Sequence, residues 1–306
     1  MPKKGSVVLM MVLMSGCMAS AQTNRSLSDL RLEIASSKRE YVLYEPVFVV
    51  LKLLNPTRDE LIGVGRKGSQ TDLAHLWIEH GGVKVEYGSG MHGDAPLDAM
   101  TYRPGEARDW MERIYFNAKS GQLAFPQVGE YRIYSRILVG KESGPVWVDA
   151  APIEIRITEP GLEDQQMIDF LGSSQGLVRL LSGSLARYCE SEPQPECYNR
   201  VAAAVNSWPG SSYAPAVSFD LASCVYAGVV DVGPRYETAE SLLKGFLERW
   251  PSDFYSGNAM QMRVISLYES GRKGDAEALL REFKERYADR KEAVAFLERK
   301  LSNSQR

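Results

Sequence analysis

The sequence predicts a two-domain protein, with an all-β sandwich followed by an all-α domain of helical hairpins. Apolar and polar residues alternate with a period of two from about residue 30 to residue 158. After residue 160 the apolar period becomes 3.6, and segments near the C-terminus repeat. The expected domains are residues 28–159 and residues 162–306, with little packing across the Pro-Gly hinge between them.

The composition is that of an ordinary globular protein. The chain has 306 residues, of which 44% are hydrophobic and 25% are charged. This is enough apolar material for two cores. The formal net charge is -3, and no basic stripe offsets it. A nucleic-acid partner is therefore not expected.

Residues 1–22 have the features of a signal peptide. Lys3 and Lys4 precede an unbroken apolar run over residues 7–14, which is too short to span a bilayer. Two cleavage sites compete. The Ala-Ser-Ala motif at residues 19–21 would free a soluble protein, whereas Met-Ser-Gly-Cys ending at Cys17 resembles the lipobox of bacterial lipoproteins. That resemblance implies lipidation of Cys17. We expect export to the periplasm or outer membrane, with membrane attachment only through the lipid.

Three further cysteines follow Cys17. Cys189 and Cys197 flank a polar turn that contains two prolines. Because export leads to an oxidising compartment, this pair is predicted to form a disulfide. The alternatives are two free thiols or pairing with Cys224. Cys224 lies in an apolar helical segment and is expected to be a buried structural thiol.

Short apolar or alternating runs separated by Gly and Pro indicate the strands of the first domain. One pair of runs flanks Gly81-Gly82 and predicts a hairpin. The predicted strands cover residues 30–34, 47–54, 73–80, 83–87, 110–116, 131–139, 146–148 and 153–157.

Several of these segments resemble bacterial immunoglobulin-like envelope domains. They are the long apolar strand that ends at Asn55, Pro-Gly-Glu at residues 104–106, Phe125, and Gly-Glu-Tyr ending at Tyr131. The resemblance covers about residues 28–158. It implies a tyrosine-corner role for Tyr131 and an adaptor or spacer role for the domain.

The helical region repeats itself. Residues 239–251 align with residues 276–288 at an offset of 37, and residues 208–213 resemble residues 250–255 at an offset of 42. Over residues 205–290 the pattern resembles the tetratricopeptide repeats of Tol-associated periplasmic proteins and outer-membrane lipoproteins. It departs from that family where Phe246 and Phe283 replace a small residue and Ala288 replaces a proline. The alternative is an irregular helical bundle.

No catalytic residue, metal site or cofactor is predicted. Residues 63–68 spell Gly-x-Gly-x-x-Gly, but a strand is expected to follow where a dinucleotide site needs a helix. His75 and His80 are five residues apart on a strand, so they are expected on opposite faces. They and His92 are interpreted as ordinary surface histidines.

The sequence thus favours a non-catalytic binding or scaffold protein of the cell envelope, whose repeats hold a protein or peptide partner. The candidate partner-binding residues are Phe219, Tyr226, Asn258, Gln261 and Tyr268. Alternatively, these rings simply pack between hairpins.

The second functional hypothesis is an envelope hydrolase or a protease-inhibitor-like protein. It would act through sandwich loops at residues 63–69 and 88–96. The sequence predicts no oligomeric state.

Overall fold

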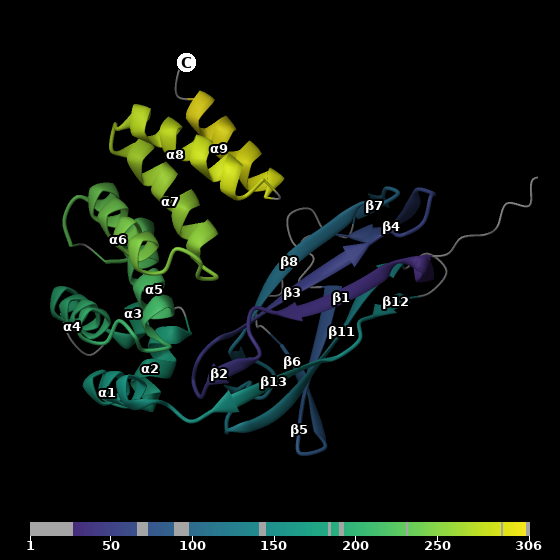
Figure 1. Ribbon diagram of the computed structural model, residues 1–306, viewed down its shortest axis with the longest axis horizontal. Helices are drawn as coiled ribbons and strands as arrows, with labels where there is room; N and C mark the ends of the chain where they lie inside the picture. Colours follow the sequence, from purple (N-terminus) through teal and green to yellow (C-terminus); the bar gives the residue numbers. More distant parts are fainter. Residues whose placement is uncertain are drawn as a thin grey trace, which may run out of the picture.

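The computed structural model describes residues 27–65, 73–88, 98–140, 145–182, 185–189, 193–230, 232–288 and 290–303. A β-rich part and a helical part lie side by side and are joined by residues 159–161 (Figure 1). The predicted signal peptide, Cys17, His92 and the loop residues 66–69 and 89–96 lie outside the described residues. Within these ranges no helix combines the length and the hydropathy that crossing a membrane requires.

Two sheets and two short strand pairs form the β part. The larger sheet has the strand order β2-β13-β11-β5-β6, with β12 also paired to β11, and the smaller sheet has the order β1-β3-β8. The pairs β4–β7 and β9–β10 complete it. A short 3-10 helix, Leu27–Asp29, precedes β1. The strands are β1 Arg31–Ser36, β2 Glu40–Val42, β3 Val47–Leu54, β4 Leu61–Gly65, β5 Ala74–His80, β6 Val83–Tyr87, β7 Asp98–Tyr102, β8 Ala107–Ile114, β9 Phe116–Asn117, β10 Gln122–Leu123, β11 Gly129–Gly140, β12 Val146–Asp149 and β13 Ile153–Thr158.

Alternation explains how the two sheets pack. In β11 the residues Tyr131, Ile133 and Ile137 are buried, whereas the residues between them point to the other face. The buried side chains of both sheets form one hydrophobic core, which includes Leu51 of β3 and Ile155 of β13. Each strand predicted from alternation is confirmed to within a few residues.

The predicted fold class, an immunoglobulin-like sandwich followed by tetratricopeptide-like repeats, is contradicted by the sheet topology. β2 runs parallel to β13, so the larger sheet is mixed. β11 pairs along one edge first with β13 and then with β12. Alternation locates strands but does not say which distant strands pair. One local expectation agrees: the Tyr131 hydroxyl donates to the carbonyl of Gln127 at 2.8 Å, as a tyrosine corner would.

The helical part is a series of helices in which neighbours in sequence pack on one another, α4 on α5 through to α8 on α9. The helices are α1 Leu162–Phe170, α2 Ser174–Leu181, α3 Leu185–Tyr188, α4 Gln194–Ser207, α5 Ala214–Ala227, α6 Arg235–Arg249, α7 Ser256–Glu269, α8 Lys273–Arg286 and α9 Lys291–Asn303.

The sequence repeat is visible in the helix ends. α4, α6 and α8 are each followed directly by an aromatic residue, Trp208, Trp250 or Tyr287, whose N–H donates to the carbonyl four residues earlier. α5 and α7 each begin just after a tyrosine, Tyr213 or Tyr255. Membership of the tetratricopeptide family stays a prediction.

The two parts pack against each other, so the expectation of little packing across the hinge is wrong. Phe48 of β3 stacks on Phe254 with ring centroids 3.8 Å apart. The Tyr213 hydroxyl donates to the carbonyl of Leu43 at 2.6 Å. Phe48 and Tyr115 belong to the same hydrophobic cluster as the helical residues around them.

An ion pair between a half-buried arginine and a buried aspartate also crosses this junction. Arg113 of β8 donates through Nη2 to the carbonyl of Leu181, and the same atom lies 3.4 Å from Oδ2 of Asp220 on α5. Burial raises the pKa of Asp220 to about 6, although the Arg113 charge acts in the opposite direction. Repeated tyrosines and this ion pair therefore direct the starts of α5 and α7 toward the β part of the same chain.

Candidate functional site

The face of the larger sheet that points away from the core carries charged and aromatic side chains on neighbouring strands. Cross-strand pairing places Tyr134 opposite Trp77 and Arg136 opposite His75. Their side chains remain half-buried or exposed. We call this surface the outer face. It comprises Glu40, His75, Trp77, Glu79, Lys84, Glu86, Glu130, Arg132, Tyr134, Arg136, Trp147, Glu154 and Arg156.

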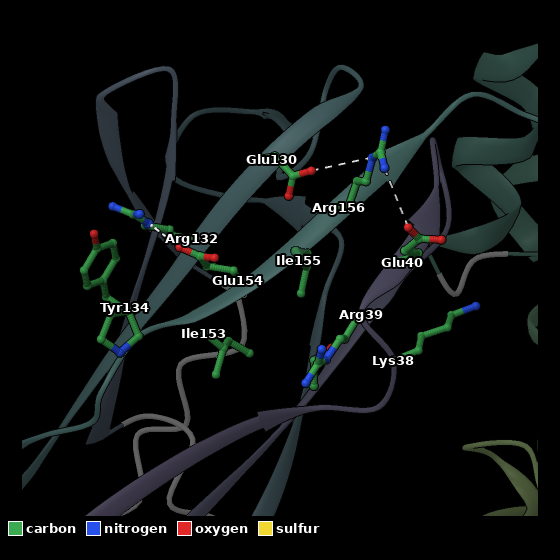
Figure 2. A pocket seen from close by; sticks show the side chains of 12 residues that line it. Lys38, Arg39, Glu40, Glu130, Arg132, Tyr134, Ile153, Glu154, Ile155 and Arg156 are labelled. Atoms are coloured by element: carbon green, nitrogen blue, oxygen red, sulfur yellow. Dashed lines mark hydrogen bonds and ion pairs between the residues drawn. The ribbon is translucent and has the colours of Figure 1, made fainter.

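Charges of opposite sign face each other across the strands at one end of the outer face. Arg156 lies 3.5 Å from Glu130 and 3.9 Å from Glu40, and Arg132 lies 2.9 Å from Glu154 (Figure 2). These side chains are more than half exposed. Exposed pairs of this kind each contribute less than about 1 kcal/mol to stability. The arrangement of these charges therefore affects which molecules can bind to the outer face more than it affects the stability of the sheet.

Aromatic rings covered by cations occupy the middle of the outer face. The Arg136 guanidinium lies 4.9 Å from the Trp77 ring centroid and 4.3 Å from that of Trp147. Lys84 Nζ lies 3.7 Å above the Tyr134 ring. Such cation–π contacts hold the rings in place without burying them.

Hydrogen bonds shift the pKa of two further groups on the outer face. The Tyr134 hydroxyl donates to Glu79 at 2.7 Å, and this bond raises the pKa of Tyr134, so the hydroxyl stays protonated at neutral pH. Lys119 Nζ lies 2.7 Å from the Glu86 carboxylate and lowers the pKa of Glu86, with a smaller contribution from His75. The face thus presents fixed rings and fixed charges.

A groove opens where the outer face meets the edge of the sheet. Its volume is about 890 Å³, and it lies between β13 and the connection from β1 to β2 (Figure 2). We call it the edge groove. It is lined by Ser36, Lys38, Arg39, Glu40, Glu130, Arg132, Tyr134, Pro152, Ile153, Glu154, Ile155 and Arg156.

The residues predicted to bind a partner on the helices do not form one surface. Phe219 stacks on Tyr255 with centroids 4.4 Å apart, inside the cluster that joins the two parts. Tyr268 is buried in a separate cluster, and Tyr226 packs against its edge. The Asn258 amide oxygen accepts a hydrogen bond from Arg290 at 2.8 Å. Gln261 is half-buried. Partner binding by these residues stays a prediction.

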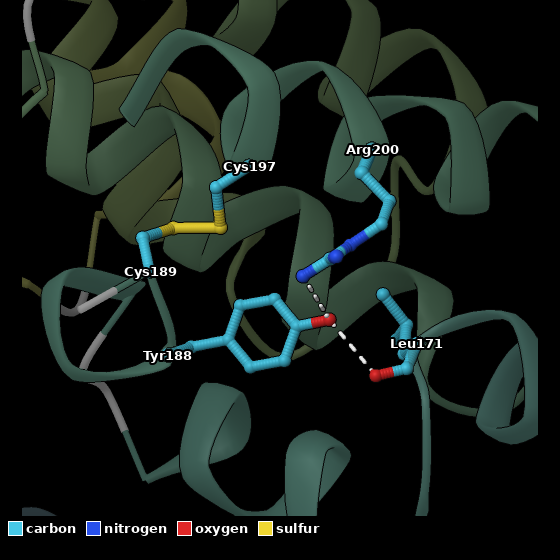
Figure 3. Close-up of a disulfide and its surroundings, with 5 residues drawn as sticks. All are labelled: Leu171, Tyr188, Cys189, Cys197 and Arg200. Atoms are coloured by element: carbon cyan, nitrogen blue, oxygen red, sulfur yellow. Dashed lines mark hydrogen bonds between the residues drawn. A yellow bond between two sulfur atoms is a disulfide. The ribbon is translucent and has the colours of Figure 1, made fainter. Parts of the chain in front are cut away.

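Cys189 and Cys197 form a disulfide, with Cα atoms 5.6 Å apart (Figure 3). The neighbouring Tyr188 hydroxyl donates to the carbonyl of Leu171 at 2.9 Å and accepts a bond from Arg200 at 3.0 Å. Cys224 is half-buried and is not in a disulfide with any described residue. The disulfide and Tyr188 together fix the start of the helical series.

His75 and His80 lie apart. His75 contacts Trp147 on the outer face, and His80 stacks on Tyr131, so the two rings do not share a ligand site. Gly63 and Gly65 lie on strand β4. In the described part of the chain, no cluster of three or more His, Cys, Asp or Glu side chains could hold a metal ion.

Sequence reasoning missed most of the outer face. One signal was present, because the alternation that buries Leu76 and Ile78 puts Trp77 at a polar-face position. A tryptophan on the solvated face of a strand is unusual enough to mark a candidate surface. Arg136 and Trp147 could not be grouped with it without knowing the strand order.

Comparisons with known proteins give no family. No protein-family model matches the chain, and no curated protein matches it. Similar solved structures include the β-glucosidase of Listeria innocua, at 13% identity and a TM-score of 0.26, covering 44% of this chain and 16% of that one. They also include the CARDB domain of the PF1109 protein from Pyrococcus furiosus, in complex with di-metal ions, at 13% identity and a TM-score of 0.26, covering 42% of this chain and 92% of that one.

A third is Spo0M, a sporulation control protein from Bacillus subtilis, at 10% identity and a TM-score of 0.25, covering 47% of this chain and 54% of that one. The match to the β-glucosidase spans about a sixth of that enzyme's length (16%). At these TM-scores the likenesses carry no argument about function.

Proposed function

We propose that the protein is a non-catalytic binding or scaffold protein of the cell envelope, and that it holds a protein or peptide partner on the outer face. The observation that carries the proposal is the group formed by Trp77, Trp147 and Arg136 on an open sheet face. Trp, Tyr and Arg dominate the binding energy of protein interfaces because they combine contact area with polar groups. The predicted repeat groove is a weaker candidate, because Phe219 already packs in the junction.

The cations that lie over the aromatic rings of the outer face favour a protein partner over a glycan. A sugar ring would need a bare aromatic face, whereas Arg136 lies over both tryptophans and Lys84 lies over Tyr134. Charged groups of both signs surround the rings, as they do around the core of a protein interface. A protein surface can match such a pattern with its own charges and backbone groups.

Attachment to the envelope is the second element of the proposal. The predicted signal peptide and the lipobox-like residues before Cys17 support export and a lipid anchor. The helical part packs on the smaller sheet through Phe48 of β3, and in that arrangement the outer face of the larger sheet would face a partner in the same compartment.

Site-directed photo-crosslinking tests the surface. Benzoylphenylalanine replaces Tyr134 on the outer face or, as the control, Phe296, which is 43% exposed on α9. We expect a discrete crosslinked species in envelope preparations from position 134 and none from position 296. The double variant Trp77→Ala, Trp147→Ala should remove it while the melting temperature stays within a few degrees of wild type. Equal crosslinking from both positions, or a product that survives the double variant, would contradict the proposal.

A further inference from the structure

The edge groove lies beside a strand edge that the sheet leaves partly open. β13 pairs with β11 over residues 153–157, but β2 covers its other edge only over residues 156–158. Among the described strands none pairs with that edge at residues 153–155. β1, which passes the other side of the groove, is itself the edge strand of the smaller sheet. A strand edge of this kind is a template for pairing with another extended chain.

The pairing with β2 tells which backbone groups face the groove. The N–H of Arg156 donates to the carbonyl of Arg39 at 2.9 Å, so the Arg156 backbone faces the β2 edge. Backbone groups in a strand alternate in direction with a period of two. The N–H and carbonyl of Glu154 therefore face the same edge, one step further along, where β2 has already turned away.

Four cations and four carboxylates meet at the groove, counting Glu45, and the ion pairs there involve every one of these cations except Arg39. Glu40 and Glu130 each pair with Arg156, Glu154 pairs with Arg132, and Lys38 pairs with the buried Glu45. The Arg39 side chain is exposed and makes no ion pair or hydrogen bond with any residue that the structure describes. Arg39 lines the groove together with Ile153 and Ile155 (Figure 2).

We propose that the edge groove binds an extended acidic peptide segment of a partner, which adds a strand to the larger sheet beside β13. Its backbone pairs with Glu154, and an Asp or Glu side chain or a terminal carboxylate pairs with Arg39. Main-chain bonds give affinity in this mode, and side-chain contacts give specificity. The inference rests on the proposed function, since it names the kind of partner segment that the same surface takes.

The test starts from a phage-displayed library of random decapeptides, selected on the purified full chain. Enriched peptides, fluorescein-labelled, are then measured by anisotropy. We expect them to carry at least one Asp or Glu. Arg39→Glu should weaken their binding by about tenfold or more, a change of about 1.4 kcal/mol. Arg103→Glu, the same charge change at an exposed turn, should leave it unchanged.

A second variant pair separates backbone from side chain. Glu154→Pro removes the N–H that faces the groove, and Glu154→Ala keeps it. Proline is tolerated at an edge position whose N–H bonds nothing. Binding should fall about tenfold in the proline variant and be retained in the alanine variant. If the proline variant does not fold, hydrogen exchange on wild type decides: peptide binding must slow exchange of the Glu154 amide, whose N–H faces the groove.

Three results would overturn the inference. They are enrichment of peptides without acidic residues, indifference to both Arg39→Glu and Glu154→Pro, and unchanged exchange of the Glu154 amide. Peptides that lose binding in the Trp77→Ala, Trp147→Ala variant but not in the groove variants would overturn the groove while leaving the proposed function intact. If no crosslink forms from position 134 while the peptides still bind and the groove variants still weaken them, the proposed function falls and the groove stands.

Discussion

The outer face and the junction use the same residue types in opposite ways. On the outer face, Arg132 and Glu154 are both more than half exposed and meet in water. At the junction, Arg113 and Asp220 meet in a hydrophobic cluster, and Asp220 is almost fully buried. Water screens the first pair, so either partner is replaceable. Removing one partner of the second leaves a buried charge. The comparison teaches that the ion pair at the junction stabilises the fold, whereas the ion pairs of the outer face contribute little to stability and leave their side chains available for contacts with a partner.

The largest expected effect comes from breaking the junction pair. Arg113→Ala should lower the free energy of unfolding by about 3–5 kcal/mol at pH 7, because Asp220 is left buried without its partner. Arg132→Ala on the outer face is the matched control and should cost less than about 1 kcal/mol. Urea unfolding followed by far-UV circular dichroism measures both. Similar losses in the two variants would remove the distinction between the regions.

The second prediction concerns pH. Because burial raises the pKa of Asp220 from 3.8 to about 6, the folded protein holds a proton between these values that the unfolded chain releases. The contribution of this group to stability is therefore full below pH 4 and is lost as the pH rises through 6. The shift of about two units corresponds to about 3 kcal/mol.

Asp220→Asn should abolish this part of the pH dependence, measured by urea unfolding between pH 4 and pH 7. Substitution of the exposed Glu154 by Gln is the control and should leave the profile unchanged. A wild-type profile without the slope, or the same slope in Asp220→Asn, would show that the buried pair does not titrate in this range.

The third prediction concerns the disulfide in the helical part of the junction cluster. Cys189 and Cys197 are buried in the cluster that contains Phe48, and their bond closes a short loop. The double variant Cys189→Ser, Cys197→Ser should lose about 2–3 kcal/mol, mainly because the unfolded chain gains freedom. Cys224→Ser is the control. Mass mapping without reductant should link residues 189 and 197. Three free thiols in the exported protein would contradict it.

Local patterns in the sequence were enough to place most strands, and long-range relations were not. The hairpin at Gly81-Gly82 follows from a turn signal, and the alternation of Leu76 and Ile78 is enough to put Trp77 on the polar face. Arg113 and Asp220 are 107 residues apart, and no periodicity links them. The mixed sheet depends on a pairing between residues 40–42 and 156–158 that leaves no local trace.

The partner-binding prediction failed to foresee the junction for the same reason. Spacing placed Phe219 and Tyr226 on one helix and Tyr268 on the corresponding helix of the next repeat. It could not show that the β part of the same chain packs on α5 at the Phe219 end. Tyr268→Ala tests this residue separately. If the ring is purely structural, the substitution should lower the free energy of unfolding by several kcal/mol.

The smallest expected effect tests whether the outer face is kept for recognition. Tyr134→Phe removes only the hydroxyl that donates to Glu79, while Lys84 still covers the ring. Because the bond is solvent-accessible, the free energy of unfolding should change by less than about 0.5 kcal/mol. Crosslinking from a neighbouring outer-face position such as Glu86 should nevertheless fall, because the freed Glu79 carboxylate loses its fixed direction. A loss of stability above about 2 kcal/mol without a change in crosslinking would assign Tyr134 to the support of the sheet. The outer face would then resemble the junction after all.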